Sequence, residues 1–75
     1  MIEWTQTERG FRLGSFRDRY GDRCSIQASS LATEECIWLG RQEILGEPTR
    51  MHLTREMAAE LGHILLNFSQ TGELP

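Results

Sequence analysis

The chain has 75 residues, 39% hydrophobic and 25% charged, with a formal net charge of −3 at pH 7. This length and composition predict one small globular domain over residues 1–75 and argue against disorder. No apolar run approaches the roughly 18 residues that span a bilayer, and the N-terminus lacks a signal-peptide pattern, so we expect a cytoplasmic protein without membrane contact. The net negative charge also argues against direct nucleic-acid binding, which depends on excess basic residues.

All eight basic residues are arginines, and most of them are close together near the N-terminus. Five fall within one short stretch: Arg9, Arg12, Arg17, Arg19 and Arg23. A guanidinium group can bind a carboxylate or phosphate through two parallel hydrogen bonds. Two interpretations stay open, namely a face that meets an acidic partner and a solvated sheet edge whose charges discourage aggregation.

Residues 1–14 allow two interpretations. Ile2 and Trp4 alternate with polar residues as in a strand, but Gly10 and Gly14 bracket the next apolar residues. This segment is therefore either an additional edge strand or a loosely held arm.

Residues 16–28 predict a β-hairpin. Phe16, Asp18 and Tyr20 alternate with Arg17 and Arg19, and Gly21 supplies a turn in which positive φ is allowed. The chain then resumes as a strand over residues 23–28. Period two divides this second strand into inward Cys24, Ile26 and Ala28 and outward Arg23, Ser25 and Gln27.

The sequence SSLATEE predicts a loop over residues 29–35, and ECIWLG predicts a third strand over residues 35–40. In that strand, Ile37 and Leu39 share one face, whereas Cys36 and Trp38 share the other. Trp38 is first interpreted as a core residue, since it is a very large apolar side chain in a small domain. The alternative is an exposed or dimer-buried anchor.

A connector and a fourth strand are expected before the helix. Gly46 and Pro48 indicate turns between residues 41 and 50, and RMHL predicts a strand over residues 50–53. Alternation in this strand places Met51 and Leu53 inward and Arg50 and His52 outward.

A helix is predicted from about residue 55 to about residue 70. Thr54 is suited to be the N-cap, Glu56 lies in the first turn, and Gly72 suits the C-terminal cap. Apolar residues recur at helical spacing: Met57, Leu61, Ile64, Leu65 and Phe68. The expected fold is α+β, a small antiparallel sheet of three to five strands with one C-terminal amphipathic helix packed on it.

The cysteines and histidines predict neither a metal site nor catalysis. Cys24, Cys36, His52 and His63 are each more than ten residues apart and lack the short spacings of zinc ligands. Cys36 and Arg41 fall one residue short of a cysteine phosphatase loop, and no serine lies in a nucleophile elbow. We therefore expect buried, reduced cysteines, no cofactor and no enzymatic activity.

A resemblance to a known group of proteins is carried by FRDRYGDRCSIQASSLATEECIWLG, TRMHLTREMAAEL and the closing TGEL. Across about residues 16–74, these motifs resemble small, largely uncharacterised proteins encoded by phages and prophages. The segment between the tryptophan strand and RMHLT is shorter here than in those proteins. Proteins of this kind usually act by binding, for example by blocking a defence nuclease, modifying host RNA polymerase or sequestering a nucleotide signal.

The leading functional hypothesis is a non-enzymatic phage-type inhibitor that binds a bacterial host protein, such as a defence nuclease. The alternatives are a regulator of host RNA polymerase and an oligomeric sponge for a nucleotide signal, and a second copy of the chain is a further candidate partner. The predicted partner-binding residues are Arg12, Arg17, Arg19, Tyr20, Arg23, Gln27, Trp38, Arg50 and His52. If the partner is a nucleic-acid enzyme, the candidates for carboxylates that stand in for phosphates are Glu34, Glu35, Glu43 and Glu47, and the alternative is an ordinary solvated face.

Overall fold

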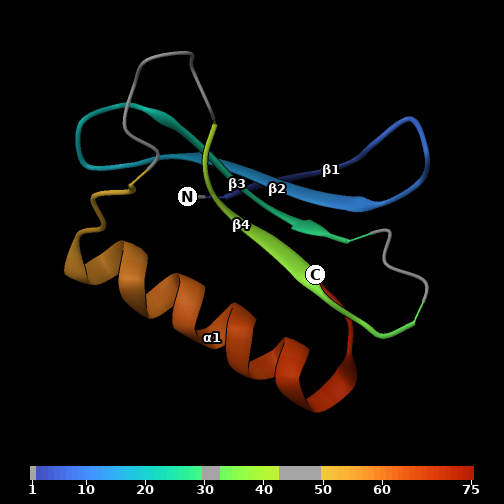
Figure 1. The fold of residues 1–75 in the computed structure, drawn as a ribbon. Helices are drawn as coiled ribbons and strands as arrows, with labels where there is room; N and C mark the ends of the chain where they lie inside the picture. The colour runs from blue at the N-terminus through green and yellow to red at the C-terminus, as the bar shows by residue number, and fades with distance from the viewer. Residues whose placement is uncertain (1, 30–32, 43–49) are drawn as a thin grey trace.

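The computed structural model describes residues 2–29, 33–42 and 50–75. It confirms the predicted α+β fold, with a four-stranded antiparallel sheet followed by one C-terminal helix (Figure 1). The strands are β1 (Glu3–Gln6), β2 (Arg12–Arg17), β3 (Arg23–Ala28) and β4 (Ile37–Arg41), and the helix is α1 (Arg55–Thr71). Each strand pairs with its neighbour in sequence, so the order is β1-β2-β3-β4.

The N-terminal residues form an edge strand, as one of the two interpretations expected. β1 pairs with β2 so that Trp4 lies opposite Gly14. A Cβ atom added to Gly14 would lie only 2.8–2.9 Å from atoms of the Ile2 and Trp4 side chains. Gly14 is therefore an interior strand residue rather than a turn, because the absence of a side chain lets Trp4 and Ile2 pack against it.

The first strand of the hairpin lies earlier in the sequence than predicted. β2 begins at Arg12 and ends at Arg17, and the chain turns over residues 18–22, where Gly21 has φ of 82°. The carboxylate of Asp18 accepts the backbone N–H groups of Tyr20 (2.9 Å) and Asp22 (3.0 Å). In a longer strand, these backbone N–H groups would bond to a neighbouring strand. Here they bond to the Asp18 side chain, so the alternating residues up to Tyr20 form a turn and do not extend the strand.

The predicted strand at residues 50–53 is absent, and this part of the prediction is wrong. Instead, the backbone N–H of His52 donates to Asp18 Oδ2 (3.0 Å), and the His52 carbonyl accepts the N–H of Arg19 (2.7 Å). Met51 packs on the core, but Leu53 is 40% exposed rather than inward. The backbone N–H and C=O groups of His52 bond to the hairpin turn. Residues 50–53 therefore do not pair with a strand of the sheet, although their side chains alternate in polarity.

The tryptophan strand begins later than predicted. β4 covers Ile37–Arg41 rather than residues 35–40, and Ile37 and Leu39 share the face directed toward α1. The expected turns at Gly46 and Pro48 lie outside the described residues. In the described part of the chain, no helix is both long and apolar enough to cross a bilayer.

Both predicted caps of α1 are confirmed. The hydroxyl of Thr54 accepts the backbone N–H of Met57 (3.2 Å), and Glu56 lies in the first turn. At the other end, Gly72 adopts the left-handed conformation with φ of 74°, and its N–H donates to the Phe68 carbonyl (2.7 Å). These bonds satisfy backbone groups that the helix ends would otherwise leave without partners.

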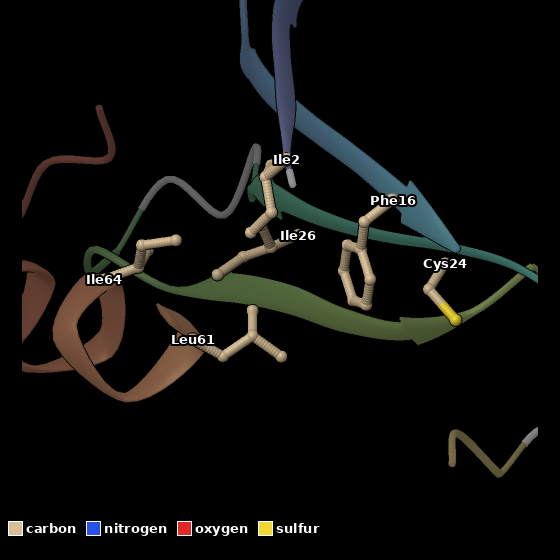
Figure 2. Close-up of a cluster of buried hydrophobic side chains, with 6 residues drawn as sticks. All are labelled: Ile2, Phe16, Cys24, Ile26, Leu61 and Ile64. Carbon is tan, nitrogen blue, oxygen red and sulfur yellow. The ribbon is translucent and has the colours of Figure 1, made fainter. Parts of the chain in front are cut away.

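The core lies between one face of the sheet and α1. Figure 2 shows Phe16 and Ile26 of the sheet directed toward Leu61 of the helix. The buried apolar residues are Ile2, Phe16, Cys24, Ile26, Leu61 and Ile64. The predicted inward positions of β3 are confirmed for Cys24 and Ile26, while Ala28 is half-buried. In the described part of the chain, α1 covers one face of the sheet and leaves the opposite face uncovered (Figure 1).

Candidate functional site

The uncovered face of the sheet, called here the open face, brings together several predicted contact residues. It carries the strand side chains that point away from α1: Glu3, Thr5, Leu13, Ser15, Arg17, Arg23, Ser25, Gln27 and Trp38. Four of these are predicted partner-binding residues, namely Arg17, Arg23, Gln27 and Trp38. The alternation of β2, β3 and β4 places them on one surface, since successive side chains point to opposite faces.

Arg17 and Arg23 form the positive end of the open face. They lie directly opposite each other on β2 and β3. The neighbouring backbone bond from Asp18 N–H to the Asp22 carbonyl (3.0 Å) makes Arg17 and Arg23 a non-hydrogen-bonded pair, in which cross-strand side chains approach most closely. The Arg17 guanidinium donates to the Gly21 carbonyl (2.9 Å), so one of the two charges is held at the hairpin turn. Two like charges at neighbouring positions repel each other, so an anion that contacts both would be bound favourably.

The two arginines also border hollows in the surface. One hollow of about 800 Å³ is lined by Arg17, Arg23 and the small hydroxyl side chains Ser15 and Ser25, among other residues. A second hollow of about 300 Å³ borders the two arginines and also contains Arg41, whose guanidinium pairs with the Asp22 carboxylate (3.3 Å) in the same hollow. Short serine side chains leave space over the sheet, and the guanidinium groups provide charge at its end. The arrangement suits an anionic group that enters from solvent.

The opposite end of the open face is aromatic. The side chain of Trp38 is 68% exposed, so its interpretation as a core residue is wrong, and it lies opposite Gln27. Together with Phe11 and Arg9 these residues line a further hollow of about 390 Å³. Trp38 is outside the core because its position on β4 faces away from α1, whatever the size of its apolar side chain.

A second group of predicted residues lies at the tip of the β2–β3 hairpin. Tyr20, which is 71% exposed, meets His52 edge to face with ring centroids 4.6 Å apart. The guanidinium of Arg19 lies over the Tyr20 ring, 5.9 Å from its centroid. His52 Nδ1 is also 3.5 Å from the buried carboxylate of Asp18. Asp18 was not among the predicted site residues. The local signal for it was a carboxylate at the start of a turn that contains Gly21.

Asp18 is held as a carboxylate by its surroundings. Burial raises the pKa of this carboxyl group, but the backbone N–H groups of His52, Asp22 and Tyr20 and the His52 side chain outweigh that effect and leave the pKa below its ordinary value. A carboxylate that accepts several N–H groups is stabilised in its charged form. Its role is to join the hairpin tip to residues before α1.

The other two predicted contact residues are not among the strand residues of the open face. Arg12 belongs to the face that α1 covers, and its guanidinium donates to the carbonyls of Thr5 (3.3 Å) and Pro75 (2.5 Å). It also lies over the Trp4 ring, 5.9 Å from the centroid. Arg50 is exposed. Arg12 therefore packs within the fold and is not joined to the arginine pair of the open face.

The cysteines do not form a reactive group in the described residues. Cys24 is buried, and burial raises the pKa of its thiol, with the nearby carboxylates of Asp18 and Asp22 acting in the same direction. A raised thiol pKa opposes the thiolate that nucleophilic attack requires. Cys36 is half-buried, and both cysteines are free thiols. The described part also holds no cluster of three or more His, Cys, Asp or Glu side chains suited to a metal ion.

The carboxylates predicted as phosphate mimics lie partly on the other side of the molecule. Glu34 and Glu35 line a hollow of about 480 Å³ together with Glu73. Arg12 and Phe68 also border this hollow, which is formed where the end of α1 meets the chain between β3 and β4. Glu43 and Glu47 lie outside the described residues. Glu34 and Glu35 therefore share a hollow with Arg12 and lie apart from the hollows bordered by Arg17 and Arg23.

The fold and these surfaces define a small α+β domain with a charged and aromatic open sheet face. No family model, curated protein or solved structure matches the chain. The resemblance to phage-encoded proteins therefore stays a prediction.

Proposed function

We propose that this chain is a non-enzymatic inhibitor that binds a bacterial host protein through its open face. The observation that carries the proposal is the pairing of Arg17 with Arg23 beside a serine-floored hollow, with exposed Trp38 on the same face. Arginine and tryptophan are the residues most enriched in the energetically dominant parts of protein interfaces. A protein surface that presents both fits a contact role better than a catalytic one.

The proposed partner contributes an acidic segment to this face. The open face carries two arginines against one carboxylate, that of Glu3, although the whole chain has a net charge of −3. A carboxylate side chain placed between Arg17 and Arg23 would relieve their repulsion and could bind both guanidinium groups. Charge complementarity of this kind raises the association rate and selects among partners.

The contact residues at the hairpin tip lie next to the arginine pair in the chain. Arg17 ends β2 and Arg23 begins β3, so Arg19 and Tyr20 follow directly in the turn between them. The ring contact between Tyr20 and His52 holds this tip in one arrangement. A partner that covers the arginine pair could therefore also reach Tyr20, whose ring is largely exposed.

The experiment is capture from bacterial lysate at moderate salt, followed by purification of the captured protein and measurement of its affinity and activity. We expect stoichiometric addition of the chain to inhibit that protein. Arg23→Glu should weaken binding at least tenfold, because it replaces a cation in the interface with an anion that repels the acidic segment of the partner. Arg55→Glu is the matched control, since it makes the same charge change at an exposed residue of α1.

The outcome distinguishes the remaining candidates. Equal affinity of Arg23→Glu and Arg55→Glu for the captured protein would contradict a role for the open face. Binding of a mononucleotide, detected by calorimetry with purified chain and lost in Arg23→Glu, would instead favour the nucleotide sponge. If RNA polymerase is the protein captured and inhibited, the target is the transcription machinery rather than a defence nuclease.

A further inference from the structure

The outer edge of β4, which carries Trp38 of the open face, leads to an inference that does not rest on the proposed function. Backbone bonds close the β3–β4 pair at both ends. The N–H of Ser29 donates to the Cys36 carbonyl (2.9 Å), and the N–H of Gln42 donates to the Arg23 carbonyl (2.7 Å). Bonded pairs alternate along an antiparallel ladder, so the even-numbered residues of β4 are the ones that bond to β3.

The odd-numbered residues of β4 therefore direct their backbone groups away from the sheet. Among the residues that the structure describes, the N–H and C=O groups of Ile37 and Leu39 have no hydrogen-bond partner. β4 is thus an edge strand with donors and acceptors in position to pair with another strand.

Both faces of this edge are apolar and accessible. The side chain of Trp38 is 68% exposed on the open face, and that of Leu39 is 38% exposed on the opposite face. The strand Ile37–Arg41 contains no proline or lysine, the residues that commonly protect a sheet edge against pairing. An edge with these properties is expected to be covered by another chain.

The sheet itself shows how such a covering strand could fit. In the β1–β2 pair, Trp4 lies opposite Gly14, and its ring occupies the space that a Gly14 side chain would need. The N–H of Thr7 donates to the Phe11 carbonyl (2.8 Å), so these two residues form a hydrogen-bonded pair. Bonded and non-bonded pairs alternate along the ladder, and Trp4 and Gly14 lie three positions further along, so they form a non-hydrogen-bonded pair. β4 contains the same two residue types, Trp38 and Gly40, separated by one residue.

The space beside Gly40 is open. A Cβ atom added to Gly40 would meet no described atom within 4 Å, in contrast to Gly14. An antiparallel copy of β4 centred on Leu39 would place its Trp38 opposite Gly40, in a non-hydrogen-bonded pair like that of Trp4 and Gly14. The same register pairs Leu39 with its own copy and Arg41 with Ile37, so no like charges lie opposite each other.

We propose that two copies of this chain form a symmetric dimer by antiparallel pairing of their β4 strands, centred on Leu39. The two sheets then form one continuous sheet of eight strands, and each Trp38 covers the partner's Gly40. A two-fold axis through the Leu39 pair relates the two copies, as is usual in soluble homodimers. An interface built from one short strand is small, so we expect the dimer to depend on protein concentration.

Sedimentation equilibrium tests the dimer. The average mass of the wild-type chain should rise from 8.6 kDa toward twice that value as concentration increases over about 10 µM to 1 mM. Leu39→Pro should remain monomeric, because it removes an N–H that points away from β3 and spares the β3–β4 bonds. Leu39→Ala keeps that N–H and should still dimerise. A constant mass of 8.6 kDa for the wild type over this range would overturn the proposal.

A cross-linking experiment tests the register and does not depend on the folding of the proline variant. In a Cys36→Ser background, Leu39→Cys should form an intermolecular disulfide on mild oxidation, because Cα atoms of a bonded antiparallel pair are about 5.5 Å apart. Gln27→Cys lies on β3, inside the sheet, and is the matched control. Cross-linking of the Leu39→Cys chain no faster than that of the control would contradict pairing centred on Leu39.

Discussion

At the scale of single residues, Gly14 decides whether the N-terminal segment can join the sheet. Its missing side chain is replaced by the Trp4 ring and the Ile2 methyl group of β1. Ile2 is part of the buried core, so the position of β1 and the packing of the core depend on the same glycine. A glycine that looked like a turn in the sequence is required because another side chain fills its place.

Gly14→Ala should destabilise the protein by about 1–3 kcal/mol, because the added methyl group overlaps the Ile2 and Trp4 side chains and forces them to move. Urea unfolding followed by tryptophan fluorescence measures this change. Gly40→Ala, measured at a protein concentration at which the chain is monomeric, is the control in the same sheet, since its Cβ atom would meet nothing described within 4 Å. Equal stability of the two variants would show that the contact with Trp4 does not constrain β1.

Arg23 and Trp38 show why residue types alone did not define the site. An arginine or a tryptophan is compatible with several environments. The alternation along a strand predicts which residues of that strand share a face, but it does not predict which residue of the next strand lies opposite or which face is buried. The opposition of Arg17 and Arg23 follows from the β2–β3 register, and the exposure of Trp38 follows from the side on which α1 packs. Both depend on contacts between segments that lie apart in the sequence.

At the scale of elements, α1 is the part most independent of the rest of the chain. Its N-cap, apolar spacing and C-terminal glycine are all local signals, and all appear in the structure. Two glycines in and after this helix have different roles. Gly72 has positive φ and caps the helix, whereas Gly62 lies within it, and an added Cβ atom there would contact nothing described within 4 Å.

These roles predict opposite effects of the same substitution. Gly62→Ala should stabilise the protein by about 0.5–1 kcal/mol, because alanine is the better residue in an exposed helix interior. Gly72→Ala should destabilise it by about 1 kcal/mol, because its φ of 74° is unfavourable for a side chain. Thermal unfolding of both variants checks the signs. A destabilised Gly62→Ala would indicate a close contact at that helix face.

At the scale of the whole molecule, Asp18 connects parts of the chain that lie 34 residues apart. Its carboxylate accepts N–H groups from the hairpin turn and from His52, just before α1. The sheet and the start of the helix are therefore joined through one buried charged group, in addition to the apolar core. A change in its protonation should affect the fold as a whole.

Acid should weaken this connection. The pKa of Asp18 is lower in the folded chain than its ordinary value, so Asp18 stabilises the fold above about pH 4, and this stabilisation is lost as pH falls through the folded pKa. The unfolding free energy measured in urea at several pH values should decrease in that range. Asp18→Asn should be less stable at pH 7 and show a weaker acid dependence. An unchanged pH profile in Asp18→Asn would contradict this role.

The sequence by itself determined the fold class, the helix with its caps and the inward face of β3, because helix caps and side-chain alternation act over a few neighbouring residues. Only the tertiary structure decided that Glu3–Gln6 rather than residues 50–53 completes the sheet. It also decided that Asp18 binds the backbone of His52 and that Trp38 is exposed. Strand pairing and burial depend on partners distant in the sequence, and several segments with suitable patterns compete for the same position in the sheet.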